Sequence, residues 1–266
     1  MMLVSRRLVA GALGLAAAAG ATGAVIARAD DSAPRAQTAQ SSGGVSISPA
    51  RVESTAKRGT VGRFTIKNTT KDTLKVTVTV RPWSQNRATG GVVINGAANL
   101  TPYVRASPAS FNLRPGSRAV RLSMRRMTAS GSLYGGIQVF AKQVKAKARN
   151  GIIPQYNVIG ALRLNPRSKR PSLKLGSTRV LGAGANRSII LEVRNLGNTI
   201  DPVGGTVSIT GPTPRNATIP QVSIVPGQVV QLKGGSLRGM KGGNYTASWT
   251  VTQSGKRYTV RAGFRL

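Results

Sequence analysis

The chain has 266 residues, of which 39 are Lys or Arg and only six are Asp or Glu, so its formal net charge is +33. It contains no His and no Cys, which removes the side chains that most often serve as general bases, thiol nucleophiles and zinc ligands. Outside the N-terminal tail only four carboxylates remain, and they are far apart in the sequence. We therefore predict a protein that is not an enzyme and that holds no metal and no other cofactor.

The first 29 residues predict export. "MMLVSRR" is a basic n-region, a weakly apolar run follows, and "ARA" before Asp30 is typical of a signal-peptide cleavage site. A membrane anchor is the alternative, because the run is about long enough to span a bilayer, but it consists mostly of Ala and Gly. Cleavage after Ala29 would leave an exported mature chain with no membrane span, in the cell envelope, at the cell surface or outside the cell. Sec and Tat export both stay open.

The cationic excess predicts attraction to polyanions such as nucleic acid, anionic lipid or cell-wall phosphate polymers. Export argues against nucleic acid as a partner in vivo, and an aromatic content of 4% leaves little surface for base stacking. The partner we expect is therefore an anionic cell-wall polymer or peptidoglycan.

Residues 30–44 are a polar tail that we predict to be disordered. From residue 45 onward period-two alternation dominates, for example over 63–67 and 74–81, which flank the turn "NTTKD". Such runs predict antiparallel strands with one buried face. Short strands with turns at this spacing are typical of an immunoglobulin-like β-sandwich.

The same order of motifs then repeats. The segment 189–210 again reads strand, Asn-led turn, strand, and 111–124 has a counterpart in 222–234, each with a Pro-Gly turn. The Pro- and cation-rich segment 164–173 separates the copies. We predict an all-β chain with a first Ig-like sandwich at 45–165 and a second at 166–266, joined by a basic hairpin and linker.

That hairpin covers 137–164, around the turn dipeptide Asn150-Gly151. From Lys142 to Arg179, both included, the sequence has ten cations and no acidic residue. On a strand Lys145, Lys147 and Arg149 would share one face, which makes this region the candidate surface for an anionic polymer; a charged edge that prevents aggregation is the alternative. The candidate binding residues are Arg51, Lys142, Lys145, Lys147, Arg149 and Arg163.

Several motifs of the first module carry a family resemblance: "VSISPARVE", "FTIKNTTKDTLKVTVTV", "PASFNLRPGSRAVRL", "LYGGIQVFAK" and "YNVIGALRL". In this order they resemble bacterial WxL-interacting proteins, which are secreted surface proteins with two Ig-like modules. The resemblance covers about residues 45–266. It implies a first module that binds peptidoglycan and a second that contacts a surface protein, and therefore a non-catalytic attachment function at the cell envelope.

The motifs "SPARVE", "FTIKN" and "FNLRPGSRAVRL" also resemble the N-terminal half of periplasmic pilus chaperones. In that family an Arg of the first strand anchors the C-terminal carboxylate of the client, and an edge strand supplies backbone hydrogen bonds. Arg51 is the matching position. The alternative function is therefore capture of a strand from a pilin-like client.

Two local features remain. Trp83 and Trp249 are expected to fill the sandwich cores, since a Trp in a sandwich is more often buried than bound to sugar. Gly135 and Gly136 lie beside a strand with no helix after them, so they are not expected to cradle a phosphate. We expect them to permit a bulge or the close passage of a neighbouring strand.

Overall fold

The computed structural model describes residues 44–94, 98–145 and 153–266, and this part of the chain is built almost entirely of β-strands. It contains no α-helix, only a single-turn 3-10 helix at Gly184–Asn186. Within these ranges we find no helix that could span a lipid bilayer. The predicted signal peptide (1–29), most of the tail, Lys147, Arg149 and the Asn150-Gly151 turn lie outside the described residues.

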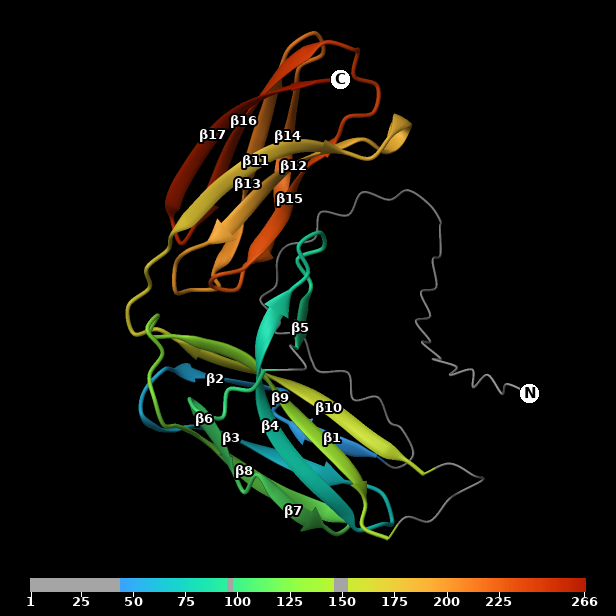
Figure 1. Cartoon of the computed structure of the whole chain (residues 1–266), viewed down its shortest axis with the longest axis vertical. Coiled ribbons are helices and arrows are strands. Elements are labelled where there is room, and N and C mark those ends of the chain that lie inside the picture. Colours follow the sequence, from blue (N-terminus) through green and yellow to red (C-terminus); the bar gives the residue numbers. More distant parts are fainter. Residues whose placement is uncertain (1–43, 95–97, 146–152) are drawn as a thin grey trace, which may run out of the picture. The chain divides into compact units, whose positions relative to one another are not determined.

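The first sandwich packs two sheets face to face (Figure 1). One sheet, here called sheet A, has the strand order β1-β3-β8-β6, all antiparallel. Its strands are β1 (Val45–Ser48), β3 (Gly59–Asn68), β8 (Gly116–Met124) and β6 (Val104–Ser107).

The facing sheet, sheet B, has the order β2-β10-β9-β4-β5, with β7 also paired to β4. All its pairs are antiparallel except β2 with β10, which run parallel. Its strands are β2 (Arg51–Thr55), β10 (Gln155–Asn165), β9 (Leu133–Gln143), β4 (Leu74–Gln85), β5 (Val92–Ile94) and β7 (Ser110–Leu113).

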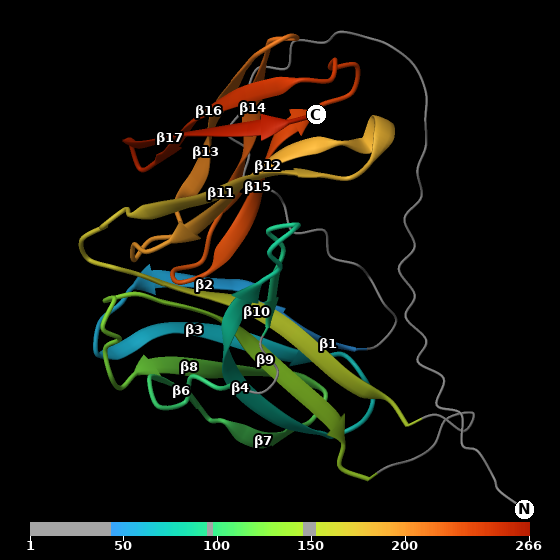
Figure 2. The same cartoon turned by 45° about the horizontal axis from the view of Figure 1, so that its top comes forward.

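The second sandwich also has two antiparallel sheets, seen at the red end of the chain in Figure 2. One has the order β11-β12-β15 and the other β14-β13-β16-β17. The strands are β11 (Leu173–Leu181), β12 (Ser188–Asn195), β13 (Pro202–Thr210), β14 (Arg215–Ser223), β15 (Val229–Ser236), β16 (Asn244–Gln253) and β17 (Lys256–Arg265). The predicted fold class, two tandem Ig-like sandwiches, is confirmed.

Alternation in the sequence produces the two cores. In β3 the side chains of Phe64 and Ile66 are buried, the flanking Arg63 and Lys67 are exposed, and Thr65 between them is partly exposed, as period-two pleating requires. The two sandwiches have separate hydrophobic clusters. Trp249 lies fully buried in the second cluster, as predicted.

Two expectations need correction. Trp83 is not part of the main core of the first sandwich: it is only partly buried and packs with Tyr134, Ile200 and Val225 in a small third cluster. The basic hairpin does not stand between the modules either, because its strands β9 and β10 are integral to sheet B. The covalent link between the sandwiches is the short segment 166–172.

Side chains of the two sandwiches also contact each other directly. The Gln85 side chain donates to the Ser223 carbonyl (2.6 Å) and accepts from the Val225 amide (3.0 Å). Arg87, in the turn between β4 and β5, forms an ion pair with Glu192 of β12 (2.6 Å). The turn between β4 and β5 therefore ties the first sandwich to the second.

Candidate functional site

About half of β10 has a neighbouring strand on one edge only. Along Gln155–Leu164, β10 pairs with β9, but on its other side β2 pairs only with Ala161–Asn165. Within the described residues no strand pairs with the outer side of Gln155–Gly160, a segment that we call the open edge. Backbone N–H and C=O groups on an unpaired strand edge are ready to bind another extended chain.

The open edge lacks the features that usually protect an exposed strand. Charged residues, Pro, bulges or very short length normally block edge-to-edge pairing. Other edge strands here have them: β17 carries Lys256 and several Arg, β11 has a register shift and two cations, and β6 is four residues long. The open edge has the sequence QYNVIG, with neither charge nor Pro. An unprotected edge of this kind is suited to binding a partner strand.

Apolar side chains line the gap between the two sheets along this edge. Tyr156 and Val158 of β10 point toward the first core but stay partly exposed, and Val45 and Ile47 of β1 do the same from sheet A. On the outer face Ile159 is 53% exposed. An added strand with alternating apolar residues would cover this row while its backbone pairs with β10.

Two of the predicted binding residues lie at one end of the open edge. Arg51, the first residue of β2, is opposite Ala161, and Glu53 is opposite Arg163. Parallel pairing therefore puts the side chains of Arg51, Glu53 and Arg163 on the same, outer face of sheet B. Arg51 contacts Glu53 (Nε–Oε2, 3.5 Å), but both side chains are well exposed, so the pair is weak.

Arg163 lies over the ring of Trp83, with 5.8 Å from its guanidinium carbon to the ring centroid. Its Nε is buried and has no hydrogen-bond partner among the described residues. The Glu53 carboxylate accepts a hydrogen bond from Asn165 Nδ2 (2.9 Å). This end of the edge therefore has two cations close to one carboxylate.

Lys142 and Lys145 lie at the other end. Lys142 is paired with Gln155, eight residues from Arg163 along β10, which corresponds to about 26 Å at strand spacing. The six predicted residues therefore do not form one patch, and Lys147 and Arg149 lie outside the described residues. Binding of a cell-wall polymer by the lysine group stays a prediction.

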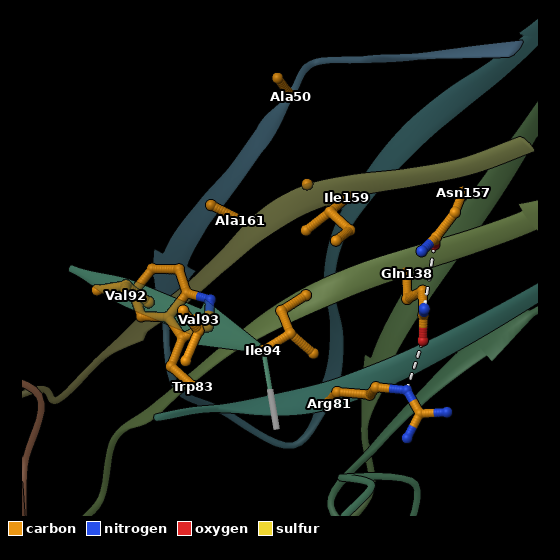
Figure 3. A pocket seen from close by; sticks show the side chains of 11 residues that line it. Ala50, Arg81, Trp83, Val92, Val93, Ile94, Gln138, Asn157, Ile159 and Ala161 are labelled. Atoms are coloured by element: carbon orange, nitrogen blue, oxygen red, sulfur yellow. Dashed lines mark hydrogen bonds between the residues drawn. The ribbon is translucent and has the colours of Figure 1, made fainter. Parts of the chain in front are cut away.

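A hollow of about 780 Å³ lies beside the open edge, on the outer face of sheet B (Figure 3). Trp83, Ile159 and the three residues of β5 form its apolar walls. Its polar side is a chain of hydrogen bonds: Arg81 Nε donates to Gln138 Oε1, and Gln138 Nε2 donates to Asn157 Oδ1 (3.0 Å). These three polar side chains are thus already hydrogen-bonded to one another.

The two glycines of β9 make room for different neighbours. A side chain at Gly136 would overlap that of Ile94 in β5, whereas a Cβ at Gly135 would lie 2.5 Å from the backbone oxygen of Arg81 in β4 and 2.8 Å from Leu100 Cδ1. The pairing of β9 with β4 and with β10 is continuous through both glycines. Close passage of a neighbouring strand, not a bulge, is therefore the reason for glycine at these positions.

Tyr134 and Asp201 are the described groups with notable pKa shifts near this end of sheet B. Burial raises the pKa of Tyr134 to about 12, and its hydroxyl lies 3.3 Å from both Asn165 Oδ1 and the Asn198 carbonyl. For Asp201, burial acts upward, but hydrogen bonds from Ser254, Lys169 and Thr199 outweigh it and lower the pKa below its usual value. Both groups thus keep their usual charge state at neutral pH, and their contacts are structural.

The residues of the hollow and of the open edge offer binding groups, not reactive ones. No carboxylate lines the hollow, and no group of three or more acidic residues occurs in the described ranges that could hold a metal ion. What the site provides is unpaired backbone, apolar side chains and guanidinium groups. This chemistry suits recognition of an extended polypeptide with an anionic end.

Sequence reasoning missed the hollow and the open edge. The strand β5 has only three residues, too few for a periodic signal, and Arg81, Gln138 and Asn157 meet only through the registers of β4, β9 and β10. The open edge depends on where β2 begins to pair with β10, which no local pattern indicates. The absence of charge and Pro at 155–160 was the one visible signal.

Comparisons with known proteins concern the fold. No protein-family model matches the chain, and no curated protein matches its sequence. The solved structure of the YadV chaperone is 13% identical, with a TM-score of 0.44, and the match covers 84% of this chain and 99% of that chain. The class 5 fimbriae chaperone CfaA is 13% identical at a TM-score of 0.46, over 83% and 98% of the two chains.

A third match is the complex of the Salmonella enterica SafA pilin with the SafB chaperone, 15% identical at a TM-score of 0.41, covering 84% of this chain and 96% of that one. These three solved structures contain pilus chaperones, the second of the two families that the sequence resembles, and no finding supports the resemblance to WxL-interacting proteins. Identities and scores this low carry no argument about function, which has to come from the geometry of this chain.

Proposed function

We propose that this protein is exported and binds an extended segment of a client protein, which adds as a strand to the open edge of β10. The observation that supports this function best is the open edge itself, six consecutive residues with an unpaired backbone side and no charge or Pro. This is the alternative function predicted from the sequence, strand capture, and it is favoured over polymer binding.

The position of β2 suggests the direction of the client strand. β2 runs parallel to β10 and begins to pair at Ala161, where the open edge ends. A client strand that runs in the same direction as β10 would end beside Arg51, the first residue of β2. Its C-terminal carboxylate would then meet the guanidinium groups of Arg51 and Arg163, and such charge-assisted hydrogen bonds are among the stronger ones in proteins.

The direct test uses a ten-residue peptide of alternating Val and Thr with a free C-terminal carboxylate. Hydrogen exchange followed by mass spectrometry should show added protection of the amides at 155–160 when the peptide is present. An Ile159→Lys variant, which places a charge at the exposed edge, should abolish this protection. Protection elsewhere only, or none at saturating peptide, would refute strand capture at this edge.

The carboxylate contact is tested separately. Arg51→Gln should weaken binding of the carboxylate peptide about tenfold, while an otherwise identical peptide with an amidated C-terminus should bind the variant and the original protein equally. Arg261→Gln, an exposed position on β17, is the matched control for loss of one positive charge. If Arg261→Gln has the same effect, the attraction is general and Arg51 is not an anchor.

A further inference from the structure

The outer face of sheet A carries a group of arginines around a hollow of about 560 Å³. Arg105 of β6, Arg121 of β8 and Arg125, which directly follows β8, line it together with hydroxyl side chains that include Ser107 and Ser123. This hollow lies on the sheet opposite the open edge, because the two sheets of the sandwich face each other through the shared core.

Strand register explains why these residues meet. Across β6, β8 and β3, Ser107 is opposite Arg121 and Arg121 is opposite Arg63; one step along, Arg105 is opposite Ser123. Directly opposed residues of antiparallel strands project on the same face. The register therefore places Arg63 and Arg121 side by side, and like charges in directly opposed positions destabilise a sheet.

Nothing in the described part of the chain offsets this repulsion. Arg63, Arg105, Arg121 and Arg125 make no side-chain hydrogen bond or ion pair there, and the strands of sheet A contain no acidic residue. A few cations elsewhere are paired: Glu192, for example, binds Arg87 and Arg179. A cationic group without a partner in the described chain, around a concave surface, is complementary to an anionic ligand from outside the chain.

We propose that this hollow, which we call the arginine hollow, binds an oligophosphate chain. Guanidinium groups match the geometry of phosphate oxygens and bind them through paired hydrogen bonds, and the neighbouring serine hydroxyls add donors. Arg121 and Arg125 are four residues apart along the strand direction, about 13 Å at strand spacing, with Arg105 opposite the position between them. This spread favours a ligand with several phosphate groups over a single phosphate ion.

The test is calorimetric titration with sodium tripolyphosphate at constant ionic strength. The chain should bind tripolyphosphate at least tenfold more tightly than orthophosphate. A variant with Arg105, Arg121 and Arg125 all changed to Gln should lose at least tenfold in affinity for tripolyphosphate. Because the ligand binds only the folded chain, it should also raise the melting temperature of the original protein.

The matched control changes Arg257, Arg261 and Arg265 to Gln. These three residues are exposed on β17 and make no side-chain hydrogen bond or ion pair among the described residues. Changing them removes the same total charge as changing Arg105, Arg121 and Arg125. Less than a threefold loss in the control supports the proposal. An equal loss in both variants, no binding by the original protein, or equal affinity for orthophosphate would overturn it.

Discussion

Asn68 and Asn195 make the same pair of hydrogen bonds in the two sandwiches. Asn68 lies at the end of β3, where its buried side-chain amide donates to the carbonyl of Asp72, four residues on (2.8 Å), and to that of Leu113 (3.1 Å). The first bond closes the turn after β3. The second ties this turn to the strand that precedes the first Pro-Gly turn.

Asn195, at the end of β12, repeats the arrangement. Its amide donates to the carbonyl of Thr199, again four residues on (2.7 Å), and to that of Ile224 (2.6 Å). Ile224 precedes Pro226 by two residues, as Leu113 precedes Pro115. The two Asn-led turns and the two Pro-Gly turns, which the sequence shows as a loose repeat, are therefore one structural unit used twice.

We expect Asn68→Ala and Asn195→Ala each to lower the free energy of unfolding by about 2–4 kcal/mol, because each leaves two inward-facing carbonyls without a donor. Urea denaturation followed by circular dichroism measures this. Asn112→Ala, at an exposed position of β7, should cost less than about 0.5 kcal/mol. If either Asn68→Ala or Asn195→Ala lowers the free energy of unfolding no more than Asn112→Ala does, the two asparagines do not share this structural role.

Gly136→Ala should destabilise the first sandwich by about 1–3 kcal/mol, since the new methyl group overlaps Ile94. In an Ile94→Ala background the same change should cost less than about 1 kcal/mol, because the overlap is gone. A double-mutant cycle from urea denaturation gives the coupling. Gly263→Ala, on β17 with no atom closer than 3.8 Å to the new Cβ, is the control. A cycle without coupling would show that Ile94 is not what requires glycine.

Asp201 should contribute stability above about pH 4. Its pKa in the folded chain is lowered from 3.8, so the stabilisation is fully present above 3.8 and is lost as pH falls through the lower folded value. Asp201→Asn should therefore be less stable than the original protein at pH 7, and the difference should shrink below pH 3.8. Lys169→Gln, which removes an ion pair of 2.9 Å, should show part of the effect. A difference that does not change with pH would refute it.

Tyr134 should stay un-ionised at a pH where ordinary tyrosines lose their proton. Its pKa is raised to about 12 by burial, whereas the unfolded chain would ionise it near 10, so its contribution to stability falls as pH rises from 10 toward 12. Absorbance at 295 nm, compared with a Tyr134→Phe variant, should show no ionisation of Tyr134 between pH 9.5 and 11. If the original protein and the Tyr134→Phe variant give equal titration curves between pH 9.5 and 11, the raised pKa of Tyr134 is confirmed. An additional tyrosinate signal near pH 10 in the original protein would contradict it.

Much of the fold follows from local sequence patterns. The alternation of Phe64 and Ile66 with cations predicts which face of β3 is buried, because side chains on a strand alternate between its two faces. The alternation in β4 does the same. The expectation for Trp83 failed because it belongs to the part of β4 that passes beyond the core to pair with β5, where its ring stacks against Tyr134 (centroids 6.5 Å apart).

The sequence by itself determined the all-β class, the two similar modules, the buried faces and the absence of His and Cys chemistry, since these depend on residue type and on the two-residue period of a strand. Only the tertiary structure decided where β2 stops covering β10, that β5 passes over Gly136, and that Arg63, Arg105 and Arg121 share one face. Each of these relationships depends on the register between strands that are distant in the chain. Register is fixed by the joint packing of both sheets around the core, and no local pattern contains that information.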